Sequence, residues 1–222
     1  MIHEILLGTE NPSKLTFFQP YFDPAGVKVI TPRQIGCSCT YPEDARTPEG
    51  NAIQKARAWH EASGMPVFAQ DSGLVFLDLP INHPDQPGTH VRRPQGVSLD
   101  DEGMIAYYTE LVRRHGGRLH AAWQDAVCLC LDDKTYLTLV KPREMLEGSS
   151  FLMVDSPIAA RHEGWPLDSI SINKKTGKYY LEEENEEEPI ETLSRATWRE
   201  IVIEWLCSQL RQSDDTDIKS DE

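Results

Sequence analysis

Residues 47–74 read TPEGNAIQKARAWHEASGMPVFAQDSGL and contain the clearest secondary-structure signals of the chain. Thr47 is a favourable helix N-cap, Pro48 suits the first helical position, and Gly64 is a typical helix stop. The pattern therefore predicts a helix over residues 48–63. The apolar run after the glycine is short, which is typical of a buried strand.

The chain on either side of this helix repeats a strand-then-helix order. Ile5-Leu6-Leu7 reads as a buried strand, Lys14 to Phe22 as a helix, and Val27 to Ile30 as a second strand. Downstream, Val67-Phe68-Ala69 reads as a third strand that ends in a turn at Gln70-Asp71-Ser72-Gly73. Successive strand and helix units predict an α/β fold, with a mixed twisted sheet and flanking helices.

The second half of the chain predicts a helix from about Ser98 to His115, ended by Gly116-Gly117. A long strand over His120–Leu131 should form a hairpin with Tyr136–Val140, which would make the sheet mixed. Thr192–Leu210 reads as an amphipathic helix.

Composition narrows the function classes. The chain has 222 residues, of which 39% are hydrophobic and 26% are charged, and its formal net charge is -14. Proteins that coat nucleic acid need clustered Lys and Arg, so we expect no nucleic-acid partner. No apolar run approaches the length that spans a bilayer, and the N-terminus lacks a basic, apolar leader, so we expect a cytoplasmic protein with no membrane partner.

The expected domain organisation is one domain over residues 1–212, long enough for two lobes, and a disordered acidic tail over 213–222. Glu182–Glu188 is a second acidic run. The five cysteines are expected to be free thiols in a reducing compartment. The alternative is a metal site formed by the Cys37/Cys39 and Cys128/Cys130 pairs.

The turn Thr9–Ser13 follows a strand and opens a helix, where backbone N–H groups attract anions. Lys14 would add a positive charge, although such a turn is also common without any ligand. The turn lacks the glycines of a Walker loop, which argues against a kinase or GTPase.

Asn51 and Lys55 are four residues apart and share one helix face, where the lysine could meet phosphate or be simply solvated. Asp71 follows an apolar strand, and Glu43 could supply a second carboxylate. Two carboxylates plus phosphate oxygens suit Mg²⁺, although an aspartate also commonly forms a turn.

The order of these segments resembles the inosine triphosphate pyrophosphatase family. Its patterns T-x-N-x-x-K, E-x-x-x-T-x-x-x-N-A-x-x-K-A and D-S-G-L read here as Thr9–Lys14, Glu43–Ala56 and Asp71–Leu74. Pro87-Gly88 with Arg93 and Gly96 looks like a fourth motif of that family. The C-terminal half matches more loosely, at residues 164–170 and 193–195. The resemblance implies two lobes around a central nucleotide cleft and, commonly, a homodimer.

The resemblance also implies roles for individual residues. Asp71 would act as general base and would bind Mg²⁺ with Glu43. Lys14 and Lys55, with the loop at Thr9, Asn11 and Ser13, would clamp the triphosphate of a purine nucleotide such as ITP, dITP or XTP. Trp165 would stack on the base, while Asp168 and Arg195 would meet its edge. Further substrate contacts are implied at Asn51, Ser72 and Arg93.

The chain departs from the family pattern at four positions. The family has a second aspartate where this chain has Gln70, a glutamate at Gly50, a histidine at Ser194 and a lysine at Pro189. Three hypotheses follow: an active triphosphate pyrophosphatase, a nucleotide-binding regulatory protein without turnover, and a hydrolase for another substrate such as a modified pyrimidine nucleotide or a sugar nucleotide.

Overall fold

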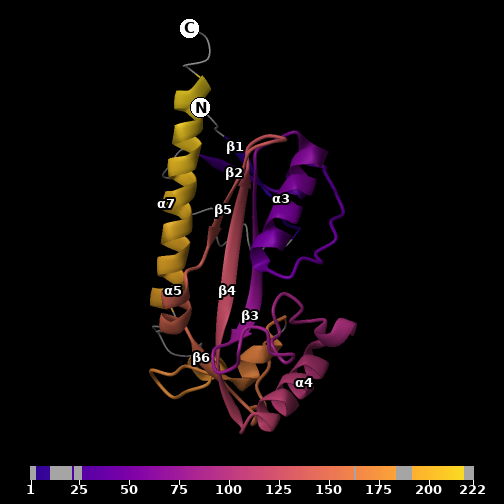
Figure 1. The fold of residues 1–222 in the computed structure, drawn as a ribbon, viewed down its shortest axis with the longest axis vertical. Coiled ribbons are helices and arrows are strands. Elements are labelled where there is room, and N and C mark those ends of the chain that lie inside the picture. The colour runs from indigo at the N-terminus through magenta and orange to yellow at the C-terminus, as the bar shows by residue number, and fades with distance from the viewer. Residues whose placement is uncertain (1–3, 11–21, 23–26, 163, 184–191, 218–222) are drawn as a thin grey trace. The chain divides into compact units, whose positions relative to one another are not determined.

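The computed structural model describes residues 4–10, 22, 27–162, 164–183 and 192–217, and within the last range the side chains of residues 198–211. The expected helix over 14–22 lies outside these ranges except for Phe22. The elements of the described chain are, in order (Figure 1), β1 (Glu4–Leu7), β2 (Lys28–Ile30), α2 (Pro32–Ile35), α3 (Pro48–Ser63), β3 (Val67–Phe76), η2 (Pro94–Gly96), α4 (Asp101–Arg114), β4 (Arg118–Cys130), β5 (Tyr136–Val140), α5 (Arg143–Gly148), β6 (Phe151–Val154), η3 (Pro166–Ile170), β7 (Ser171–Ile172), α6 (Tyr180–Glu183) and α7 (Thr192–Asp217).

The strands form one seven-stranded sheet in the order β2-β1-β3-β4-β6-β7, with β5 paired to β4. β1 pairs in parallel with both β2 and β3. β4 pairs antiparallel with β5 and with β6, and the predicted hairpin joins Cys130 to Tyr136. The prediction of an α/β fold with a mixed sheet and flanking helices is therefore confirmed.

The chain divides into two compact units, each made of separate segments. Unit 1 contains residues 1–71, 125–140 and 196–222, and unit 2 contains residues 72–124 and 141–195. β3 and β4 each contribute residues to both units. α7 continues to Asp217, so it includes residues 213–217, which we expected in a disordered tail.

In unit 1, α3 begins and ends where its capping residues predict. The Thr47 hydroxyl accepts the backbone N–H of Gly50 over 3.2 Å, and Gly64 ends the helix with a left-handed φ of 67°. The buried face of α3 packs with β1 and β3 in a cluster that includes Leu6, Trp59 and Ala69. Figure 1 shows α3 and α7 on opposite sides of the strands of this unit.

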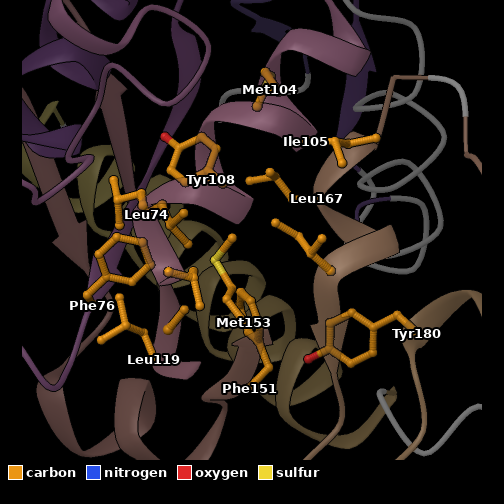
Figure 2. Close-up of a cluster of buried hydrophobic side chains, with 14 residues drawn as sticks. Leu74, Phe76, Met104, Ile105, Tyr108, Leu119, Phe151, Met153, Leu167 and Tyr180 are labelled. Carbon is orange, nitrogen blue, oxygen red and sulfur yellow. The ribbon is translucent and has the colours of Figure 1, made fainter. Parts of the chain in front are cut away.

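The core of unit 2 lies between α4 and the strands that it covers (Figure 2). Tyr108 and Leu111 of α4, Phe76 of β3 and Phe151 of β6 are almost completely buried. Asp100 is the N-cap of this helix, and its carboxylate accepts the backbone N–H of Gly103 over 2.8 Å. Its cap and its apolar face therefore agree with the sequence pattern.

The expected turn at Gln70–Gly73 is wrong, because β3 runs through it without a break. Leu74 and Phe76 are buried in the core of unit 2, so burial of this second half favours a continuous strand over a local turn. β1 pairs with β3 only as far as Phe68. Asp71 therefore lies within a strand, just beyond the end of its parallel partner.

Candidate active site

Four predicted residues meet in unit 1 around the Lys55 ammonium group. Its Nζ lies 2.6 Å from Oδ1 of Asp71 and 2.6 Å from Oε1 of Glu43. Asn51 donates from Nδ2 to the other oxygen of Asp71 over 3.0 Å. We call Glu43, Asn51, Lys55 and Asp71 the carboxylate–lysine cluster.

The helix α3 brings two members of this cluster to one buried face. Asn51 and Lys55 are one turn apart, so both point to the same side of the helix. Ala52 and Ala56 are fully buried beside them, and their small side chains let the helix lie close to its neighbours. Lys55 is only 8% exposed, so its charge needs compensation from nearby acids.

The loop that carries Glu43 fits closely on the first turn of α3. Oδ1 of Asn51 accepts the backbone N–H of Ala45 over 2.9 Å. A Cβ atom at Gly50 would lie 2.6 Å from Cβ of Ala45, so no side chain fits there without movement of the loop. Glu43 itself has a left-handed φ of 46°, an uncommon conformation for a non-glycine residue. The glycine at position 50 is thus required by the close approach of this loop.

The electrostatics of the cluster favour a permanently charged lysine. Burial acts to lower the pKa of Lys55, but the charges and hydrogen bonds of Asp71 and Glu43 outweigh burial and raise this pKa above its ordinary value. Two carboxylates face one ammonium, which leaves one formal negative charge. Such a cluster is suited to attract a cation.

Tyr41 is a member of the site that the sequence reasoning missed. The Lys55 Nζ lies 5.8 Å from the centroid of its ring, within the range of a cation–π contact. The same ring lies 6.4 Å from the ring of Trp59, which is fully buried in α3. Burial is the main cause that raises the pKa of the Tyr41 hydroxyl. In the sequence, the signal that could have identified Tyr41 is its position two residues before Glu43.

The expected phosphate loop is described only at its start. Thr9 follows β1, and its backbone N–H donates to the carbonyl of Leu7 over 2.7 Å. Asn11, Ser13 and Lys14 lie outside the described residues. The expected convergence of Lys14 with Lys55 and Asp71 therefore stays a prediction.

The residues expected to bind the base, Trp165, Asp168 and Arg195, all belong to unit 2. Trp165 is 52% exposed, so it does not serve as core packing. Its ring lies 6.2 Å from that of His162, whose Nδ1 is 3.3 Å from Oδ2 of Asp168. His162 was not predicted from the sequence. The backbone of Arg195 lies in α7, and its side chain is outside the described part of the chain.

Ser72 and Arg93, two further expected substrate contacts, also lie in unit 2. Ser72 follows Asp71 within β3, and Arg93 directly precedes the short helix η2. Both residues make interactions of their own in the structure.

The carboxylate–lysine cluster fits the ligand preference of Mg²⁺ with substrate oxygens present. Glu43 and Asp71 offer hard oxygen atoms beside the Lys55 ammonium group, and Mg²⁺ commonly binds through one or two acids, water and phosphate. Within the described ranges, a different group, His83, Asp85 and His115, places three ligating side chains close together. The magnesium site would therefore be completed by the nucleotide.

The described cysteines do not come together as a metal site. All five are free, and no three of the described cysteines come together as ligands. Burial raises the pKa of Cys39 to about 11 and that of Cys128 to about 12, so both thiols stay protonated near neutral pH.

None of the described helices is both long and apolar enough to cross a membrane.

Comparison with known proteins identifies a family and several named relatives. The model of the Ham1 family matches residues 5–149. A dITP/XTP pyrophosphatase of Flavobacterium psychrophilum is 30% identical over 135 residues, which cover 60% of this chain and 67% of the relative. A dITP/XTP pyrophosphatase of Bacillus subtilis is 33% identical over 105 residues, which cover 47% of this chain and 51% of the relative. This chain thus spans about half to two thirds of the length of these relatives.

The fold is also that of solved structures. A HAM1 protein from Coxiella burnetii superposes with a TM-score of 0.69 at 22% identity and covers 96% of this chain and 100% of its own. The Ham1 protein of Staphylococcus aureus gives a TM-score of 0.66 at 21% identity, with coverage of 93% and 99%. Since the family match spans well over half of the chain and includes every member of the carboxylate–lysine cluster, this protein belongs to the Ham1 family.

Proposed function

We propose that this protein hydrolyses non-standard purine nucleoside triphosphates, such as dITP, XTP and ITP, to the monophosphate and pyrophosphate in the presence of Mg²⁺. The observation that carries the proposal is the convergence of Glu43, Asp71 and Lys55 at two contacts of 2.6 Å. The names of the Flavobacterium and Bacillus relatives supply the substrate class.

The carboxylate–lysine cluster has the groups that such a reaction needs. Asp71 would accept a proton from the water that attacks the α-phosphorus, and Asn51 would keep its carboxylate oriented. Lys55 would place a fixed positive charge beside the phosphates. Glu43 and Asp71 would hold Mg²⁺, which would supply neutralisation of phosphate charge. Lys14 and the loop at Thr9, Asn11 and Ser13 would hold the rest of the triphosphate.

Base recognition would fall to residues of unit 2. The exposed ring of Trp165 would stack on the purine, and a stacked base is worth about 1 to 3 kcal/mol. Asp168 and Arg195 would meet the base edge, with Ser72 and Arg93 as further contacts. A pocket whose donor pairs with O6 of hypoxanthine or xanthine leaves that donor unpaired when adenine binds, which would disfavour ATP.

The direct test is release of pyrophosphate from dITP, XTP, ITP, GTP and ATP with Mg²⁺ present or chelated. We expect turnover of the first three, dependence on Mg²⁺, and loss of turnover in Asp71→Asn. Release from none of the five would contradict the proposal, as would full activity of Asp71→Asn.

A second candidate is a nucleotide-binding protein of the same fold without turnover. The close approach of Ala45 to Gly50 favours this candidate. The loop leaves no room at position 50 for the glutamate that the family carries there. Gln70 likewise replaces an acid. This candidate predicts thermal stabilisation by ITP and Mg²⁺ without any product, so the same samples distinguish the two.

The cytoplasmic location and the homodimer expected from the sequence form part of this proposal. Light scattering of the purified chain would test the dimer, and a mass of one chain would contradict it.

A further inference from the structure

Unit 2 contains a second group of ligating side chains that the proposed reaction does not use. The ligand atoms of His83, Asp85 and His115 all lie within 4.8 Å of one another. Nε2 of His115 is 2.8 Å from Oδ2 of Asp85. The two imidazole rings face each other edge to face, with centroids 5.4 Å apart. We call these three residues the histidine–aspartate group.

The chain builds this group from two segments that are each fixed by their own hydrogen bonds. His83 donates its backbone N–H to Pro80, and its carbonyl accepts from the backbone of Gln86. The Gln86 side chain accepts the N–H of Phe76 over 2.9 Å and donates to the carbonyl of Phe76 over 2.8 Å. His115 is the C-cap of α4. These hydrogen bonds therefore hold the segments that carry the ligands.

The donor set indicates which ion would bind. Two imidazoles and one carboxylate are typical ligands of Zn²⁺, whereas Mg²⁺ prefers oxygen donors alone. Ligands of a tetrahedral Zn²⁺ ion are about 3.3 Å apart, so the pair His115–Asp85 would need to open by only a small movement. The side chains of His115 and Asp85 are 20% and 17% exposed, which leaves access for the ion and for a water ligand.

We propose that His83, Asp85 and His115 bind one Zn²⁺ ion, with water as the fourth ligand, at a site separate from the carboxylate–lysine cluster. The ion would replace the His115–Asp85 hydrogen bond and join the loop at residues 83–85 to the end of α4. Its expected effect is to stabilise unit 2.

Two neighbouring groups would compete with the ion for its ligands. Arg114 approaches Oδ1 of Asp85 at 3.5 Å, so its charge opposes a bound cation. His83 Nδ1 accepts the backbone N–H of Asp85 over 3.1 Å, and this bond would be lost if that nitrogen bound the ion. Without zinc, His115 and Asp85 share a 2.8 Å hydrogen bond, and the rings of His83 and His115 meet edge to face.

The test uses the full chain, freed of metal with a chelator and titrated with Zn²⁺ alone by calorimetry. We expect one high-affinity ion per chain and a rise in the unfolding temperature. His115→Ala and Asp85→Asn should each weaken binding by at least about 100-fold, since each removes one of three ligands. The matched control is His120→Ala, because His120 pairs with Asp78 at 3.1 Å without a second histidine. This control should bind Zn²⁺ as the wild type does.

Co²⁺ then separates this site from the cysteines. Binding at the histidine–aspartate group should give visible d–d bands without a thiolate charge-transfer band. Circular dichroism without metal would establish that each variant is folded. Absence of stoichiometric Zn²⁺, thiolate ligation, or equal affinity in the folded His115 and Asp85 variants would overturn the proposal. None of these measurements depends on nucleotide hydrolysis.

Discussion

Asn51 donates a hydrogen bond from Nδ2 to Oδ2 of Asp71 over 3.0 Å, and so fixes the orientation of that carboxylate. The other end of the same amide accepts the backbone N–H of Ala45 over 2.9 Å. One buried side chain therefore connects the strand that carries Asp71 to the loop that carries Glu43. The position of both acids depends on it.

Asn51→Ala should lower kcat/KM by about 100-fold, because a displaced general base loses near-attack geometry. It should also lower the free energy of unfolding by about 1 to 3 kcal/mol, since buried polar groups lose their partners. Pyrophosphate release and urea unfolding measure the two effects. The control is Gln54→Ala on the same helix, which removes a 2.9 Å bond to Asp44 but none to Asp71. If both variants lost activity equally, Asn51 would act only by holding the loop and not by orienting the Asp71 carboxylate.

Lys55→Met should lower the free energy of unfolding at neutral pH by about 1 to 3 kcal/mol, because it leaves the part-buried carboxylate of Asp71 and the more exposed one of Glu43 without their cation. The folded-state pKa of Lys55 is raised above 10.5, so its stabilising contribution is complete below pH 10.5 and is lost as the pH rises through the folded value. The difference between wild type and variant should therefore be constant from neutral pH to about 10.5 and shrink above it. Denaturant unfolding across this range tests the sign.

Lys28→Met is the matched control for the Lys55 variant. Lys28 pairs with Glu4 at 2.8 Å, but the two side chains are 66% and 49% exposed. Its loss should cost no more than about 1 kcal/mol. A Lys55 variant as stable as this control would show that the buried pairs contribute little.

Gly50→Ala should destabilise the protein by about 1 to 3 kcal/mol, because the new Cβ would lie 2.6 Å from Cβ of Ala45. The displaced loop should also raise the Mg²⁺ concentration needed for half-maximal activity. Gly148→Ala, at the end of α5, has no atom within 4 Å of the new Cβ and should be neutral or slightly stabilising. Thermal unfolding compares them; a neutral Gly50 variant would mean that the loop moves freely.

Trp165→Ala should raise KM for dITP by about 10- to 100-fold with little change in kcat, since base stacking contributes about 1 to 3 kcal/mol to binding. Steady-state kinetics separate the two constants. Ile81→Ala removes another exposed apolar side chain of unit 2, 79% exposed, and should leave both constants unchanged. An unchanged KM in the Trp165 variant would remove this residue from the base site.

The features that were predicted correctly are those with local causes. Thr47 and Gly64 act on their own helix, so its bounds follow from neighbouring residues. Asp71 was expected in a turn because its neighbours are turn formers, but burial of Leu74 and Phe76 in unit 2 favours a continuous strand. The meeting of His83 with His115 depends on how a loop and a distant helix end fold together, which no local pattern shows.

The division of each unit into separate chain segments has a consequence during synthesis. Unit 2 is complete once residue 195 has left the ribosome, whereas unit 1 still lacks residues 196–222. Val202, Leu206 and Leu210 of that last segment are buried, so the core of unit 1 cannot be completed before they are synthesised. Although the carboxylate–lysine cluster is translated within the first 71 residues, the unit that contains it should be the later one to mature on the nascent chain.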